Sequence, residues 1–107
     1  FIKENVKMVK HMVMWSFKEE IPEEKKAELK AQIKENLEGL VGVVPGLISA
    51  RVITEPLSSS SRDLCLITEL ESAKALADYA VNPNHVKVAD TYVRPNVCDR
   101  VAMDFEM

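Results

Sequence analysis

The segment Val9–Phe17 constrains the fold most, because it alternates like a strand and yet is apolar on both faces. One face of this predicted strand collects the odd-numbered residues, which are Val9, His11, Val13, Trp15 and Phe17. The opposite face carries Met12 and Met14, where a half-exposed strand would carry polar side chains. We therefore expect both faces of the sheet to be covered, which points to dimerisation.

Three helices are predicted from periodicity and end signals. The first begins at Pro22, because proline is favoured in the first turn of a helix. Its apolar stripe repeats at spacings of three and four residues and consists of Leu29, Ile33, Leu37, Leu40 and Val41. The second helix follows Ser72, a favourable N-cap, and ends at Pro83, because the residue before proline avoids helical angles. A short third helix is expected from about His85 to Pro95.

Three further strands are predicted over 48–53, 63–70 and 97–106, where apolar and polar residues alternate. With the first strand, the order of elements is strand, helix, strand, strand, helix, strand. This order predicts an α+β, ferredoxin-like βαββαβ domain with an antiparallel sheet and an extra short helix before the last strand. The crossovers give the expected strand order 4-1-3-2.

Length and charge exclude several classes of protein. The chain of 107 residues is long enough for one domain, which we place over 8–107, with an N-terminal extension over 1–7. Its net charge is −3 without a long basic run, so no nucleic-acid partner is expected. No apolar stretch approaches the roughly 18 residues of a membrane span, so no membrane partner is expected. Cys65 and Cys98 fall on strands separated by another strand, so we expect free thiols and a cytoplasmic location.

Several short motifs in a fixed order resemble one known family. These motifs are Lys10-His11, Trp15-Ser16-Phe17-Lys18, Pro45-Gly46-Leu47, Asp63, Ala75-Leu76-Ala77-Asp78-Tyr79, Asn82-Pro83-Asn84-His85 and Asp99-Arg100-Val101-Ala102-Met103-Asp104-Phe105. Over residues 8 to 107 the chain resembles the stress-responsive α/β-barrel (Dabb) family of the dimeric α+β barrel superfamily. The resemblance implies a homodimeric α+β barrel, in which two sheets face each other and the helices lie outside.

The resemblance also suggests catalytic candidates. Six residues separate Tyr79 from His85, which would turn them apart on an unbroken helix, but a break at Pro83 would let both face one cavity. A cyclase of this family uses a histidine and a tyrosine as its acid/base pair, at positions matching His85 and Tyr79. Asp104 matches the family's near-terminal aspartate and would orient either His85 or His11. The alternative is structural, with His85 capping the third helix and Tyr79 packed in the core.

A pocket for a small hydrophobic or aromatic ligand is expected between the helices and the sheet. Its candidate contacts are His11, Val13, Trp15, Leu66, Val88 and Tyr92. The alternative for these residues is ordinary core packing. No cofactor is expected, because three glycines cannot form a glycine-rich phosphate cradle. No metal is expected, because the two histidines lack clustered carboxylates.

The chain departs from the cyclase pattern, and this weakens the prediction of that reaction. Asn82 replaces the first histidine of the family's frequent H-P-x-H motif, Leu64 replaces a histidine of the third strand, and the first helix has no tyrosine. We therefore predict a small dimeric ligand-binding protein without assured turnover. One alternative is a cofactor-independent cyclase, isomerase or lyase with a His-Tyr pair. Another is a monooxygenase or haem-handling relative from the wider superfamily.

Overall fold

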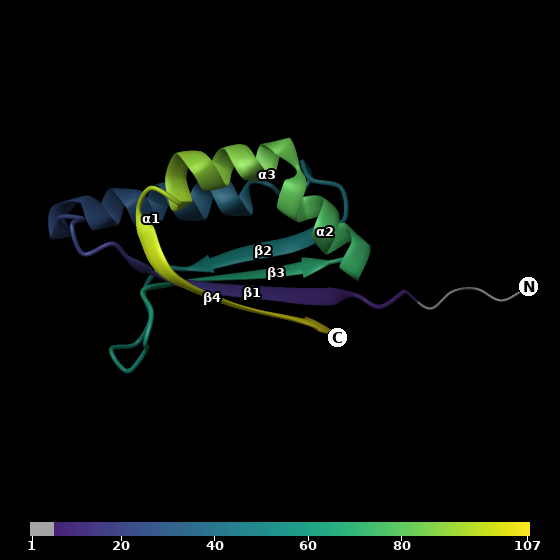
Figure 1. Cartoon of the computed structure of the whole chain (residues 1–107), viewed down its shortest axis with the longest axis horizontal. Helices are drawn as coiled ribbons and strands as arrows, with labels where there is room; N and C mark the ends of the chain where they lie inside the picture. Colours follow the sequence, from purple (N-terminus) through teal and green to yellow (C-terminus); the bar gives the residue numbers. More distant parts are fainter. Residues whose placement is uncertain (1–5) are drawn as a thin grey trace, which may run out of the picture.

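The computed structural model describes residues 6–107 and forms one four-stranded antiparallel sheet with helices on one side (Figure 1). In chain order the elements are β1 (Val9–Phe17), α1 (Glu23–Glu38), β2 (Leu47–Ile53), β3 (Leu64–Leu70), α2 (Ala73–Val81), α3 (Pro83–Val88), the π-helical turn η1 (Ala89–Val93) and β4 (Val97–Glu106). This is the predicted ferredoxin-like α+β fold. Of the extension predicted over 1–7, residues 1–5 lie outside the described part of the chain.

The strand order is β2-β3-β1-β4, which is the predicted order. The central strand β1 pairs antiparallel with both β3 and β4, so its residues have partners on two sides. His11 lies between Thr68 and Asp104 in this register. Cys65 on β3 and Cys98 on β4 flank β1, and both thiols are free, as predicted.

A bulge interrupts the pairing of β1 with β4. Met14 pairs with Val101 but Ser16 pairs with Cys98, so β4 contains one extra residue opposite Trp15. Asp99 has a φ of 54°, in the left-handed region that aspartate tolerates better than most residues. The extra residue shifts the alternation of β4 by one position. Alternate residues counted from the buried Val97 are therefore assigned to the wrong face of the sheet after the bulge.

Helix α1 packs its apolar stripe on the sheet, with Ile33 and Leu37 fully buried. Glu23 and Glu24 lie in its first turn, where negative charge stabilises the helix dipole. The helix ends at Glu38, earlier than the predicted stripe. The following turn still buries Leu40, but it leaves Val41 40% exposed, so the prediction that Val41 belongs to the stripe was wrong.

The break between α2 and α3 depends on side-chain caps. The Ser72 hydroxyl accepts a hydrogen bond from the backbone N–H of Ala75 and starts α2. The Asn82 side chain accepts one from the N–H of Asn84 and starts α3, with Pro83 in its first turn. The third helix therefore begins two residues before the predicted start, because Pro83 both ends one helix and opens the next.

The two faces of the sheet differ in burial. The face toward the helices is buried and holds the core, which includes Val13, Ile33, Leu37, Val52, Leu64 and Leu70. On the open face Met14 is 42% exposed and Met103 67% exposed, and Figure 1 shows no described element beneath the sheet. Within residues 6–107 no helix has the length and apolar character needed to cross a membrane.

Candidate functional site

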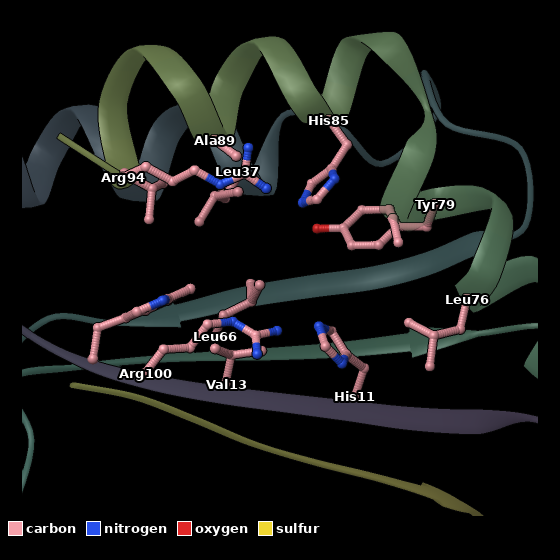
Figure 2. Close-up of a pocket in the computed structure, with 13 residues that line it drawn as sticks. His11, Val13, Leu37, Leu66, Leu76, Tyr79, His85, Ala89, Arg94 and Arg100 are labelled. Carbon is pink, nitrogen blue, oxygen red and sulfur yellow. The ribbon is translucent and has the colours of Figure 1, made fainter. Parts of the chain in front are cut away.

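A cavity of about 250 Å³ lies between the sheet and the helices (Figure 2). We call its sheet side the sheet wall, formed by His11, Val13, Trp15, Leu66 and Arg100. We call the opposite side the helical wall, formed by Leu37, Leu76, Tyr79, Ala80, His85, Ala89, Val93 and Arg94. The lining is mostly apolar, and its polar groups are few and face the interior, as in sites for small molecules.

Tyr79 and His85 meet in the helical wall. Their ring centroids lie 4.1 Å apart with the planes tilted by 33°. Tyr79 lies in the last turn of α2 and His85 in the first turn of α3, so the break at Pro83 directs both rings into one cavity, as the sequence predicted. The Tyr79 side chain is 1% exposed, and neither its hydroxyl nor the buried Nδ1 of His85 has a hydrogen-bond partner. Unpaired buried polar atoms are rare, and each lowers the stability of the fold.

Burial changes the protonation behaviour of this pair. It raises the pKa of Tyr79 to about 12, because the phenolate would lose its hydration. Burial also lowers the pKa of His85, because the protonated ring would lose its hydration, and the positive charge of Arg94 lowers this pKa further, while the nearby backbone of Ala80 and Tyr79 raises it in part. At neutral pH the cavity therefore contains a protonated hydroxyl beside a neutral imidazole. One can donate a proton, and the other can accept one.

His11 faces this pair from the sheet wall. Its ring lies edge-on to Tyr79, with centroids 6.3 Å apart. The Nδ1–H of His11 donates a hydrogen bond to the Asp104 carboxylate across the β1–β4 register. Asp104 therefore orients His11, and it is not the partner of His85. This bond fixes the tautomer and leaves the Nε2 of His11 able to accept a hydrogen bond in the cavity.

The structure brings most of the predicted ligand contacts together, but not all. His11, Val13, Trp15 and Leu66 line the cavity as predicted. Val88 and Tyr92 do not, and they instead line a separate surface hollow beside Asn36 and Leu40 of the first helical segment.

The reason for this difference is helical rotation. His85, Ala89 and Val93 recur every four residues and face the cavity. Val88 and Tyr92 precede Ala89 and Val93 by one position, which turns them about 100° away toward α1.

The predicted site residues do not include two arginines that line the cavity, Arg94 and Arg100. The bulge makes the position of Arg100 unpredictable from alternation, because alternate residues counted from the buried Val97 assign Arg100 to the open face. Arg94 stands one residue past η1 and gives no periodic signal. Among residues 6–107 no group of three or more histidine, cysteine, aspartate or glutamate side chains is placed to hold a metal.

Solved structures with the same fold include proteins of unknown function and an enzyme. A dimeric ferredoxin-like protein of unknown function from Bacteroides fragilis has a TM-score of 0.85 at 23% identity, covering 94% of this chain and 96% of that one. A dimeric ferredoxin-like protein of unknown function from Thermobifida fusca has a TM-score of 0.78 at 18% identity, covering 100% and 97%. Hydroxynitrile lyase from Passiflora edulis has a TM-score of 0.70 at 13% identity, covering 96% and 95%. At these identities the likeness establishes the fold.

A search of curated proteins finds no match. Family models do give one, which agrees with the motifs and with the βαββαβ order. Residues 9–107 match the Stress responsive A/B Barrel Domain, Dabb, and the chain therefore belongs to the Dabb family.

Proposed function

We propose that this protein binds a small hydrophobic or aromatic ligand in the cavity between the sheet wall and the helical wall. The observation that carries the proposal is the pair of buried polar atoms without partners, the hydroxyl of Tyr79 and Nδ1 of His85. A polar group on a ligand would supply the missing hydrogen bonds, while its apolar part would pack on Val13, Trp15 and Leu66. The cavity volume of about 250 Å³ suits a compound of one or two rings.

An NMR titration with 2-acetonaphthone, a neutral aromatic ketone, tests this proposal. We expect saturable shifts of the amide signals of cavity residues, and a Kd about fivefold to tenfold weaker in Tyr79→Phe, which loses the hydroxyl donor. Tyr92→Phe is the matched control, because it removes a tyrosine hydroxyl outside the cavity. Shifts spread over the surface, or equal loss of affinity in both variants, would contradict binding in this cavity.

A second candidate function is cofactor-independent acid–base catalysis, favoured by the close contact of Tyr79 with His85. The neutral imidazole of His85 is suited to remove a proton next to a carbonyl, and the Tyr79 hydroxyl is suited to donate to the carbonyl oxygen. The hydroxynitrile lyase of the same fold supports only the capacity of the fold to hold a catalytic cavity. The monooxygenase and haem-handling alternative stays a prediction.

Deuterium incorporation into the methyl group of 2-acetonaphthone in D₂O tests the catalytic candidate. We expect exchange above the buffer rate, with a loss of 100-fold or more in His85→Gln. Since His11 also faces the cavity, His11→Gln is measured beside it to decide which imidazole is the base. Binding without any exchange would reject this catalytic role while leaving ligand binding intact.

We also propose that two copies of the chain pair through the open face of the sheet. Met14, Val101, Met103 and Phe105 are exposed apolar side chains on this face, and the neighbours from Bacteroides fragilis and Thermobifida fusca are described as dimeric. Sedimentation should show a dimer that dissociates in Met103→Glu, which places charge in the apolar patch. A monomeric parent protein would overturn this proposal.

The free thiols of Cys65 and Cys98 support a reducing, cytoplasmic location.

A further inference from the structure

Two arginines enter the cavity from opposite walls. Arg100 comes from β4 in the sheet wall, and Arg94 comes from the helical wall just after η1. Figure 2 shows both guanidinium groups extending along the cavity toward the histidines, Arg94 on the side of His85 and Arg100 on the side of His11. Two positive charges thus face one mostly apolar space.

The two arginines differ in whether an acidic residue pairs with them. None of the 13 lining residues is an aspartate or glutamate, although the chain as a whole has a net charge of −3. Arg94 forms an ion pair with Asp90 on its exposed side. Arg100 forms no ion pair or side-chain hydrogen bond within residues 6–107, and the nearby Asp104 is held by His11. Of these two exposed arginines, Arg100 is therefore the one whose charge is not paired with a carboxylate among residues 6–107.

The position of Arg100 depends on the bulge in β4. The extra residue at Asp99 lets Arg100 lie opposite Trp15 on the helix side, while Val101 pairs with Met14 on the open side. Bulges of this kind often redirect a side chain next to a functional site. The guanidinium of Arg100 is thereby directed over the same sheet wall that offers apolar contacts.

We propose that the cavity selects ligands that carry a carboxylate beside an apolar or aromatic body, with Arg100 as the main anchor and Arg94 as a weaker one. This inference rests on the proposed ligand binding and names the chemical class of the ligand. A guanidinium fork matches a carboxylate with two parallel hydrogen bonds. The other oxygen contacts would come from Tyr79, whose hydroxyl lies between the two walls in Figure 2. Arg94 is the weaker anchor because Asp90 already binds it.

A matched pair of probes tests the inference. The carboxylate 2-naphthoate and the neutral ketone 2-acetonaphthone have nearly the same shape, and each is titrated by NMR into the parent protein, Arg100→Gln and Arg94→Gln. We expect the parent to bind 2-naphthoate about tenfold more tightly than the ketone. In Arg100→Gln this preference should fall to near unity, because binding of 2-naphthoate weakens far more than binding of the ketone. In Arg94→Gln it should fall by a smaller factor. Arg51→Gln is the control, because Arg51 is an exposed residue of β2 outside the cavity.

The possible results separate the two proposals. Equal affinity for both probes in the parent would overturn carboxylate selection and leave the ligand-binding function standing. A preference for 2-naphthoate that Arg51→Gln removes as strongly as Arg100→Gln would also overturn it, because the effect would then come from overall charge. Failure of both probes to bind in the cavity would overturn the ligand-binding function itself. A preference that weakens as salt rises, and that Arg100→Gln removes, supports the inference.

Discussion

The two walls of the cavity are built in different ways. The sheet wall lies on the central strand β1 and its neighbours β3 and β4, where a hydrogen-bonded register fixes each side chain. The helical wall comes mainly from α2, α3 and η1, three short segments joined at Asn82 and Ala89, with Leu37 of α1 and Arg94 beside them. In the sheet wall His11 is bonded to Asp104, whereas in the helical wall the buried hydroxyl of Tyr79 and Nδ1 of His85 have no partner.

This difference indicates which wall of the cavity can change its conformation to admit a ligand. A wall held by strand pairing resists local change, while a wall of short capped segments opens at a lower free energy. The buried polar atoms that lack partners, on Tyr79 and His85, lie in the less constrained wall, where a ligand can meet them. The following predictions test this division, beginning with the largest effect.

The largest effect should come from truncating the sheet wall. Leu66→Ala removes a buried side chain from the core and should lower the free energy of unfolding by about 3 kcal/mol. The same truncation in the helical wall, Leu76→Ala, should cost about 1 kcal/mol, because Leu76 is only partly buried. Urea denaturation at one fixed protein concentration compares them. An equal loss of unfolding free energy in both variants would contradict the difference expected between the two walls.

Removing an unpaired hydroxyl should stabilise the helical wall. Tyr79→Phe keeps the packing of the ring but deletes a buried polar atom without a partner, so the free energy of unfolding should rise by about 1 kcal/mol. Tyr92→Phe, whose hydroxyl lies outside the cavity, should change it little. Loss of stability in Tyr79→Phe would mean that the hydroxyl is already bonded in the free protein.

The caps should contribute slightly less. Asn82→Ala removes the side chain that accepts a hydrogen bond from the N–H of Asn84, and we expect a loss of about 0.5–1 kcal/mol. Because this cap lies at the junction of α2 and α3, amide exchange should accelerate in α3 and leave β1 protected. Uniform acceleration through the sheet would contradict the independence of the two walls.

The smallest effect should be a pH dependence of stability that comes from His85. The pKa of His85 is lower in the folded protein than its ordinary value of 6.5, because its ring is buried. Below about pH 6.5 the unfolded chain therefore takes up a proton that the folded chain resists, and stability falls. Denaturation midpoints at pH 7.5 and pH 5.5 should converge in His85→Gln. An unchanged pH slope in that variant would assign the effect to another group.

Sequence reasoning succeeded for the two walls to different degrees, for a physical reason. In the sheet wall, alternation placed His11, Val13 and Trp15 on one face of their strand, because strand geometry has a fixed period, and the family resemblance placed that face under the helices. Alternation failed at Arg100, since an extra residue in a strand depends on backbone torsions that no side-chain pattern displays.

In the helical wall, the family resemblance selected Tyr79 and His85, and the proline break explained their convergence. The same reasoning chose Val88 and Tyr92 in place of Ala89 and Val93, because the rotation of a short helix depends on where it starts. The predicted start at His85 was two residues late, and the rotational phase of α3 is set by the Asn82 cap.

The unpaired hydroxyl of Tyr79 and ring nitrogen of His85 also make the stability of the folded chain depend on the concentration of its ligand. A ligand that satisfies both atoms binds only the folded state, so its concentration adds to the folding free energy through mass action. At 100 times its Kd, this contribution is about 2.7 kcal/mol. For a domain of this size that corresponds to a rise in Tm of roughly 10 °C. Thermal shift of the free protein in a metabolite mixture would then reveal the physiological ligand without any assumption about a reaction.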